Sequence, residues 1–437
     1  MSGGGRAVPA RALKAVTPAP IEEREADRLD VRVSQGRLHA AHVRAVAQAV
    51  AEFHHSPDCA PGDASGEAPT PVGIMRQTRS SCERFAERAT TLGLAPIDVE
   101  RVIGSLARLQ RERLAWLLPR LESVRLRRRH AMLCCARAWV DDDLKARVDP
   151  GPGSSARNDV LDVAEDLAGL FVDLSSRGAS SAGRTLLGEY ALRTDDYSLF
   201  RAIGLYAPAA ACQLASAAIE FAGDCASERE RAEALVPLAL GSQAASQAAW
   251  LFAVGGGVAS GKSTLARALA DSLGAVRVVA DSVRDALLEY PSDVPVHELA
   301  WTRTFSPGFE GRVYEGLCRR AEHALATGHP VVLDACFPSA RRRIGLTELA
   351  ARNGAALVFV ECRPDAETVR ARLEARDERD RASRGWQQLA AGLVARWEPR
   401  TQNEPGMHAV LDTGRPVSES LDALRAQIDA SVEVASE

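Results

Sequence analysis

Nine residues from Gly256 to Thr264 have the types and spacing of a phosphate-binding loop. They fit the pattern G-x-x-x-x-G-K-[S/T], in which backbone N–H groups wrap around a β-phosphate. In that arrangement Lys262 reaches the β- and γ-phosphate oxygens, and the Ser263 hydroxyl holds Mg²⁺. The sequence therefore predicts ATP or GTP binding at Gly256, Gly257, Val258, Ala259, Ser260, Gly261, Lys262, Ser263 and Thr264.

The segments on either side of this loop have the character of a strand and a helix. Residues 249–254 form a short apolar run that is typical of a buried strand, and residues 265–273 have helical apolar spacing. The N-terminus of such a helix would point at the phosphates. This context favours a nucleotide site over a chance match to the pattern.

A second group of candidate residues follows the next predicted strand, Val276–Ala280. Asp281 comes at its carboxyl end, where open α/β sheets bind their ligands. A carboxylate there can accept the proton of an acceptor hydroxyl, and Arg284, one helical turn on, can hold an anionic group of the acceptor. The alternative is that Asp281 caps a helix starting at Ser282, a role that is compatible with catalysis.

Asp334 ends another predicted strand, Pro330–Asp334. We expect its carboxylate to bind Mg²⁺ through water or to orient the substrate, because it reaches the same edge of the sheet. The alternative is that it only satisfies neighbouring backbone groups. The basic run Arg341–Arg343 is interpreted as a solvated helix face or as a binding site for phosphate groups.

An arginine-rich segment follows further along the chain. Its arginines are Arg370, Arg372, Arg376, Arg379, Arg381 and Arg384. A mobile lid that brings arginines over a triphosphate would stabilise the charge of the transferring phosphoryl group. We single out Arg376 and Arg379 as the lid contacts. The alternative is an exposed helix with i,i+4 ion pairs to the interspersed acidic residues.

The chain divides near residue 245 into two predicted domains, 1–245 and 246–437. The first has little strand signal, and its predicted helices are Ala40–Phe53, Ile97–Leu121, Val160–Ser175, Ala182–Leu192 and Leu199–Phe221, with loops at Ser56–Gly73 and Asp149–Ser155. In the second, strands alternate with helices, which predicts an α/β fold with a parallel sheet covered on both faces. Its predicted strands are Trp250–Gly255, Val276–Ala280, Pro330–Asp334, Ala356–Glu361 and His408–Leu411.

Composition limits the class of protein. The 437 residues carry a net charge of −4, so no overall positive field indicates nucleic acid. Nine cysteines without metal-ligand spacing are typical of reduced thiols, and we expect a cytoplasmic protein. The segment Met1–Val16 lacks the apolar core of a signal peptide. Because Ile203–Ala222 is rich in alanine and includes Pro208 and Glu220, we expect a buried helix there and no membrane partner.

Residues 248–437 resemble the P-loop kinases grouped around zeta toxins, polynucleotide 5′-kinases and gluconate kinases. The resemblance rests on the phosphate loop, Asp281–Arg284, Phe305–Pro307, Val332–Ala335, the arginine-rich segment and Leu411–Thr413. It implies a P-loop NTPase kinase domain of the AAA family ATPase type, with a five-stranded parallel sheet and a lid. It also implies transfer of the γ-phosphate of ATP to a hydroxyl with Mg²⁺, without identifying the acceptor.

The first domain resembles the C-terminal lobe of aminoglycoside phosphotransferase-like proteins, on the segments Leu38–His54, His130–Leu133, Asp162–Ala168 and Val172–Leu174. That family has the motif His-Gly-Asp-Leu-His at the positions that start with His130 in this chain. Its catalytic Asp therefore falls on Met132 here. The family's metal-binding Asn falls on Arg137, and Asp149 is the position left for its second metal-binding Asp. Few residues precede Leu38, so the lobe that clamps ATP is nearly absent. The resemblance therefore implies a mostly helical, degenerate domain without phosphotransfer of its own.

Taken together, these features predict an ATP-dependent kinase whose acceptor is a small molecule such as a sugar, a nucleotide sugar or an antibiotic. A polynucleotide 5′-hydroxyl kinase would use the same residues, with Arg341–Arg343 and Arg125–Arg129 contacting backbone phosphates, so a nucleic acid partner stays open. A nucleotide-dependent switch is the third alternative. Asp281 argues against it, because a switch needs to position only water.

Overall fold

The computed structural model describes residues 24–59, 70–91, 98–122, 126–128, 132–149, 160–222, 226–239, 249–288, 306–379, 395–401 and 404–436. The contacts between Cα atoms divide the chain into two compact units, and the division falls between Ser246 and Gln247. The two units are described separately.

The C-terminal unit is built on a five-stranded parallel sheet with the strand order β6-β7-β5-β8-β9. Its strands are β5 (Trp250–Gly255), β6 (Val276–Val279), β7 (Val331–Asp334), β8 (Ala356–Cys362) and β9 (Met407–Leu411). Its helices are α9 (Lys262–Leu273), α10 (Ala280–Leu288), α12 (Pro307–Leu325), α13 (Ala340–Arg352), α14 (Ala366–Arg379) and α16 (Val417–Ser436). The predicted α/β class and all five predicted strands are confirmed.

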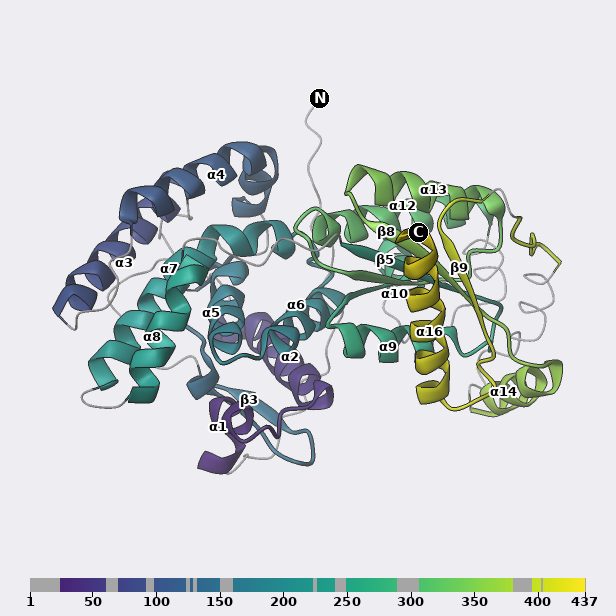
Figure 1. The fold of residues 1–437 in the computed structure, drawn as a ribbon, viewed down its shortest axis with the longest axis horizontal. Coiled ribbons are helices and arrows are strands. Elements are labelled where there is room, and N and C mark those ends of the chain that lie inside the picture. The colour runs from purple at the N-terminus through teal and green to yellow at the C-terminus, as the bar shows by residue number, and fades with distance from the viewer. Residues whose placement is uncertain are drawn as a thin grey trace. The chain divides into compact units, whose positions relative to one another are not determined.

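Helices cover both faces of this sheet (Figure 1). On one face, α9 and α16 bury Leu265, Leu269 and Leu424 against the strands. The strands contribute apolar side chains to the same core from Phe252, Val254, Val332, Val358, Val360, Ala409 and Leu411. On the other face, α12 packs on β6 and β7, and α13 packs on β8. Burial on both faces explains why the strands read as near-continuous apolar runs in the sequence.

The N-terminal unit is mostly helical, as expected. Its helices are α1 (Leu29–Ser34), α2 (Ala40–His55), α3 (Pro71–Thr91), α4 (Val99–Leu121), α5 (Val163–Ser176), α6 (Ser180–Thr194), α7 (Leu199–Ala222) and α8 (Ala226–Ala239). Its strands are β1 (Leu126–Arg128), β2 (Ala138–Val140), β3 (Ala146–Val148) and β4 (Val160–Asp162). The pairs β1–β4 and β2–β3 are antiparallel. These strands were not predicted, because three residues are too few to show an alternating pattern.

The helices predicted in this unit differ from the observed ones at several ends, and α1, α3 and α8 were not predicted. The predicted loop Ser56–Gly73 is wrong at its end, since α3 begins at Pro71 and Thr70 Oγ1 accepts the N–H of Gly73 at 3.0 Å. The helix predicted at Val160–Ser175 begins three residues later than predicted, because residues Val160–Asp162 form β4. Asp162 then caps α5 by accepting the N–H of Ala164 at 3.0 Å.

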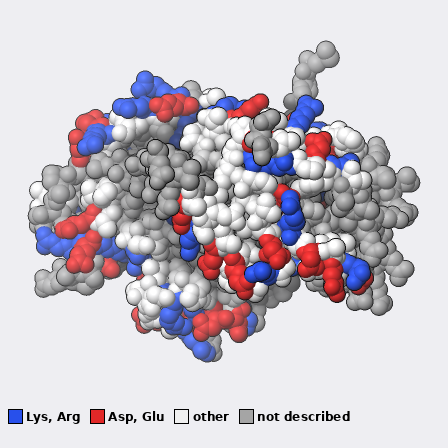
Figure 2. Space-filling model, turned by 45° about the vertical axis from the view of Figure 1, so that its right-hand side comes forward, with Lys and Arg blue, Asp and Glu red and all other residues white. Residues whose placement is uncertain are grey.

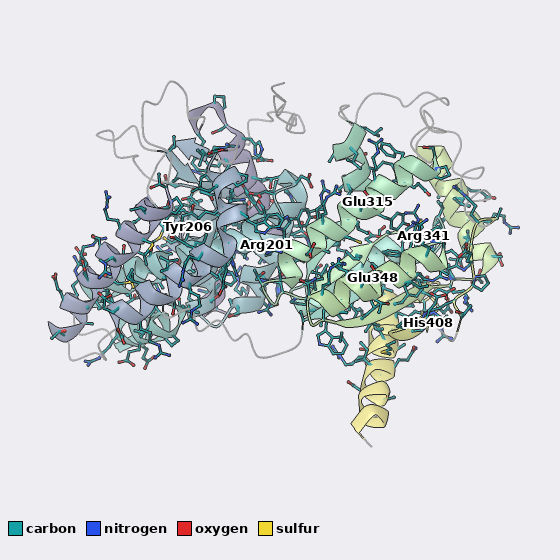
Figure 3. All side chains as sticks on the ribbon, turned by 90° about the horizontal axis from the view of Figure 1, so that it is seen from above. Arg201, Tyr206, Glu315, Arg341, Glu348 and His408 are labelled. Carbon is teal, nitrogen blue, oxygen red and sulfur yellow. The ribbon has the colours of Figure 1, made fainter. Side chains whose placement is uncertain are left out.

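The buried guanidinium of Arg120 joins three segments of the N-terminal unit. It donates to both carboxylate oxygens of Asp162, each at 2.7 Å, and to Asp196 at 2.7 Å. Tyr206, labelled in Figure 3, donates its hydroxyl to Asp162 at 3.2 Å. Burial lowers the pKa of Arg120, but the two carboxylates raise it more, so the pKa lies well above its usual range. Arg120 therefore stays charged in the core.

We expect Arg120→Ala to destabilise this unit strongly, because Asp162 and Asp196 would be left buried without their counter-charge. Breaking a buried ion pair in this way costs about 3–5 kcal/mol. Thermal unfolding of the full chain measures the loss. The control is Arg79→Ala, which removes an exposed ion pair with Glu100 in the same unit and should change little. Equal effects of the two substitutions would contradict the expectation.

Helix α7 is the core helix of this unit. Its segment Leu199–Glu220 is long and apolar enough to cross a membrane, but 72% of its apolar stretch is buried inside the protein. Helices α3, α5 and α8 pack around it (Figure 1). This burial fits the prediction of a buried helix, because a core helix satisfies the same criteria of length and composition.

Candidate functional site

The loop between β5 and α9 has a backbone that requires glycine at two positions. Gly256 has φ 147° and Gly261 has φ 84°, both in the region that side chains disfavour. A Cβ atom at Gly256 would also lie 2.7 Å from Ser260 Oγ and 2.9 Å from the carbonyl oxygen of Cys362. The two fixed glycines of the motif thus allow the chain to turn from the strand into the N-terminus of α9.

Three neighbouring segments hold this loop. The N–H of Gly256 donates to the carbonyl of Cys336 at 3.2 Å, just beyond β7. From α14, Arg372 donates to the carbonyl of Ala259 at 3.3 Å and to that of Thr413 at 2.8 Å. Thr413, which follows β9, donates its hydroxyl to the carbonyl of Ser260. These hydrogen bonds tie the loop to the segments around it.

Lys262 is the cation of the loop, and its Nζ donates to the carbonyl of Gly257 at 3.3 Å. Burial lowers the pKa of Lys262, but Cys336, Asp334 and Asp281 raise it more, and the pKa lies above its ordinary value. Burial raises the pKa of the Cys336 thiol, so at neutral pH that thiol is uncharged and the two carboxylates hold the lysine in its charged form.

Ser263 and Asp334, the two residues that the sequence analysis assigns to Mg²⁺, lie together. The Ser263 hydroxyl donates to Asp334 Oδ1 at 3.1 Å. The other oxygen, Oδ2, is buried and has no hydrogen-bond partner among the described residues. Burial raises the pKa of Asp334, and Lys262 and Ser263 only partly oppose it. A hydroxyl and an unpartnered carboxylate oxygen fit Mg²⁺, which binds few protein ligands and keeps water and phosphate oxygens.

We expect Asp334→Asn to weaken Mg²⁺-dependent nucleotide binding about 10–100-fold, the usual effect of losing a partner in or next to the metal shell. Calorimetric titration with ATP in Mg²⁺ and again in EDTA measures this, and only the Mg²⁺ titration should change. Burial raises the pKa of Asp334. On acidification, the wild-type protein should therefore lose the Mg²⁺ dependence of its nucleotide binding at a higher pH than it would if Asp334 had an ordinary pKa. An unchanged Mg²⁺ dependence in the variant would contradict the metal assignment.

Asp281 lies in the first turn of α10, which begins at Ala280. The alternative of Asp281 capping a helix that starts at Ser282 is therefore wrong, because β6 ends early enough for the helix to begin before it. The Asp281 side chain is 76% exposed, and its Oδ1 accepts from the guanidinium of Arg284, which is 14% exposed. Val279 of β6 pairs with Asp334 of β7, so Asp281, two residues further along, follows the same end of the sheet as Asp334.

A cavity of about 360 Å³ adjoins the phosphate loop. Its lining includes Gly261, Thr264, Arg372, Thr413, Arg415 and Ser420. Two guanidinium groups and several hydroxyls thus surround a space that is continuous with the loop. The sequence prediction named Arg372 only as one member of the arginine-rich segment and did not name Arg415.

The predicted lid is described only in part. Arg376 and Arg379 belong to the last turns of α14, but their side chains lie outside the described residues, as do Arg381 and Arg384. Arg372, one turn earlier on the same helix, is the arginine that reaches the loop. The signal for it in the sequence was its place in the arginine-rich segment, which did not distinguish it from its neighbours.

The basic run on α13 is not a solvated face. Arg343 is only 4% exposed and forms two hydrogen bonds with Glu404, at 2.7 and 2.9 Å. The guanidinium of Arg342 lies 3.9 Å from the centre of the Tyr314 ring. Of the three arginines, only Arg341, labelled in Figure 3, is exposed. Both interpretations of the run are therefore wrong for Arg343, which is a structural residue.

In the N-terminal unit, Met132 lines a cavity of about 300 Å³ with Glu165, Asp166 and Tyr206. His130 lies outside the described residues. Asp149 and Arg137 meet through their backbones, with an N–H to carbonyl distance of 2.9 Å. Across the described ranges, no group of three His, Cys, Asp or Glu side chains could hold a metal ion.

Comparison with known proteins places these residues in a wider context. Residues 251–395 match the family model of an AAA domain, and this range includes the phosphate loop, Asp281 and Asp334. Uncharacterized proteins of Mycobacterium tuberculosis and Mycobacterium bovis are 29% identical over 250 residues, which cover 54% of this chain and 47% of theirs. The chain therefore spans about half the length of the curated relatives it matches.

Solved structures also align with part of this chain. A gluconokinase from Sinorhizobium meliloti 1021 is 19% identical, with coverage of 43% of this chain and 95% of its own and a TM-score of 0.32. A sugar kinase from a Janibacter species is 18% identical, with coverage of 41% and 95% and a TM-score of 0.32.

Proposed function

We propose that this protein is an ATP-dependent kinase that transfers the γ-phosphate to a hydroxyl of a small molecule. The observation that carries the proposal is the convergence at one edge of the sheet of the phosphate loop with Lys262, the Ser263–Asp334 pair and the exposed carboxylate of Asp281. Phosphoryl transfer needs these parts: a cradle for the triphosphate, a metal site and a proton acceptor.

The nucleotide would bind with its β-phosphate in the loop and its nucleoside in the adjoining cavity between Arg372 and Arg415. The N-terminus of α9 favours the negative charge of the phosphates. Lys262, kept charged by its acidic neighbours, would contact the β- and γ-oxygens. Ser263 and Asp334 would hold Mg²⁺, which neutralises charge on the phosphate oxygens when bound.

Asp281 would act on the acceptor. As the acceptor oxygen bonds to the γ-phosphorus and the bond to the β–γ bridging oxygen of ATP breaks, the hydroxyl proton passes to the Asp281 carboxylate, and ADP leaves. Arg284 fixes that carboxylate through Oδ1 and can also hold an anionic group of the acceptor. An exposed carboxylate suits this role, because the acceptor must reach it from solvent.

The division of labour between the units is also a proposal. Residues 246–437 would form the catalytic domain, and residues 1–245 a helical domain without phosphotransfer, because Met132 cannot take a proton where a base would be required. We propose that the helical domain selects the substrate or regulates the kinase. The 300 Å³ cavity that Met132 lines offers room for a ligand.

The direct test is an ATP-consumption screen of the purified protein against pooled sugars, nucleotide sugars, aminoglycosides and 5′-hydroxyl oligonucleotides. We expect one small-molecule pool to stimulate ADP release well above the rate in buffer, with phosphate recovered on the acceptor. Stimulation by the oligonucleotides alone would favour a polynucleotide kinase. Tight ATP binding with no stimulated pool would favour a nucleotide-dependent switch.

The polynucleotide alternative has less support than the small-molecule one. Arg343 is buried in an ion pair, so it is not available to a phosphate backbone. On the face drawn in Figure 2, the described positive and negative side chains are interspersed, without a broad positive area. A polynucleotide kinase would bind its nucleic acid much more weakly as the salt concentration is raised, so the salt dependence of binding tests this alternative.

A further inference from the structure

Phe337, three residues beyond β7, has a backbone conformation that is rare for its side chain. Its φ is 51°, in the left-handed region, and the residue is fully buried. A bulky residue keeps such a conformation only where the surrounding structure enforces it, and such positions gather at functional sites. The loop that follows β7 is therefore held in an unfavourable turn at the edge of the sheet where the phosphate loop lies.

Two side chains enforce this turn. The N–H of Phe337 donates to the hydroxyl oxygen of Tyr314 at 2.9 Å, and its carbonyl accepts from Arg343 at 3.1 Å. Tyr314 comes from α12 and also packs edge-on against the Phe337 ring, with 5.4 Å between ring centres. Arg343 comes from α13 and is itself held by Glu404 and by the carbonyl of Glu398 at 2.9 Å. Both backbone polar groups of one strained residue are thus fixed by side chains.

The turn sets the position of the preceding residue, which contacts the phosphate loop. The carbonyl of Cys336 accepts the N–H of Gly256 at 3.2 Å, at the start of the loop. The Cys336 side chain packs in a small apolar cluster with Val258 of the loop and Leu373 of α14. A displacement of Phe337 would therefore be passed to the residues that surround the β-phosphate.

We propose that Tyr314 is a positioning residue of the nucleotide site, which acts through Phe337 and Cys336 to place Gly256. The proposal rests on the nucleotide-binding part of the proposed function and not on the identity of the acceptor. Tyr314 is linked to the nucleotide loop through Phe337 and Cys336. Its hydroxyl fixes the turn on which the first N–H of the loop depends, so its removal should weaken nucleotide binding more than it weakens the fold.

The test is Tyr314→Phe in the full chain, with Mg·ATP as the probe in calorimetric titration. The variant keeps the ring against Phe337 and under Arg342, but it leaves the Phe337 N–H without its acceptor. We expect Mg·ATP to bind about 3–10-fold more weakly, the scale of one hydrogen bond. The matched control is Tyr190→Phe in the N-terminal unit, which removes a buried hydroxyl bonded to His54 at 2.9 Å and should leave the affinity unchanged.

Arg343→Lys changes the side chain that donates to the Phe337 carbonyl in the same turn. This variant should also bind Mg·ATP more weakly than the wild type. The titrations are made well below the melting temperature of each variant. Wild-type affinity in Tyr314→Phe would overturn the proposal, also where its melting temperature is lower, because the role would then be structural only. A wild-type protein that binds Mg·ATP but phosphorylates no acceptor would overturn the proposed function alone. One that fails to bind Mg·ATP would overturn both.

Discussion

Lys262→Ala should remove tight Mg·ATP binding and phosphotransfer together. Lys262 is the charged side chain at the start of α9, and Asp334 and Asp281 keep it protonated. With alanine at this position, the negative charge that develops on the γ-phosphate during transfer would no longer be stabilised by this cation. Removing one such preorganised donor costs about 10²–10³-fold in rate. Calorimetric titration with Mg·ATP and a coupled assay of ADP release measure the two losses on one preparation.

The matched control for that experiment is Arg267→Ala. It removes a cation from an exposed position on the same helix, five residues further along, and should keep both nucleotide affinity and turnover. Turnover retained in Lys262→Ala would show that another site carries the chemistry. It would also reopen the N-terminal unit as a phosphotransferase, despite the methionine at position 132.

Asp281→Asn should separate a kinase from a protein that only binds nucleotide. Asparagine has the size of aspartate and can still accept a hydrogen bond from Arg284, but it cannot take the proton of an acceptor hydroxyl. Loss of a general base typically lowers the rate about 10²–10⁴-fold. Because the side chain is 76% exposed, melting temperature and ATP affinity should stay near those of the wild type while transfer collapses.

Asp422→Asn is the control for this change, since it neutralises an exposed carboxylate on α16. Transfer rates on the acceptor found in the screen, melting temperatures and Mg·ATP affinities are compared for the two variants and the wild type. A transfer rate in Asp281→Asn within a factor of about three of the wild type, far short of the loss expected for a base, would remove Asp281 from the mechanism.

The sheet and the loop could be predicted because their signals are local. Each of the five strands is a near-continuous apolar run between helices, and the loop is defined by spacing within nine residues. Asp334 could be placed beside Ser263 from sequence, although 71 positions separate them. The carboxyl ends of neighbouring parallel strands share one edge of the sheet.

Contacts between distant side chains could not be predicted in the same way. Arg343 reads as part of a solvated basic run, and its burial depends on Glu404, which is 61 residues away and has no special sequence context. Arg372 reads like the arginines around it, and only the fold shows that this one faces the loop. The φ of Phe337 has no signal in the sequence either, since its cause lies on α12 and α13.

The hydrogen bonds of Arg372 couple the affinity for the nucleotide to the position of α14. One guanidinium donates to the carbonyls of both Ala259 and Thr413, so the helix that carries the first arginines of the arginine-rich segment is bonded both to the phosphate loop and to the residues that follow β9. Thermodynamic linkage then applies in both directions. Whatever shifts α14 changes nucleotide affinity by a certain factor, and nucleotide binding biases the position of α14 by that same factor.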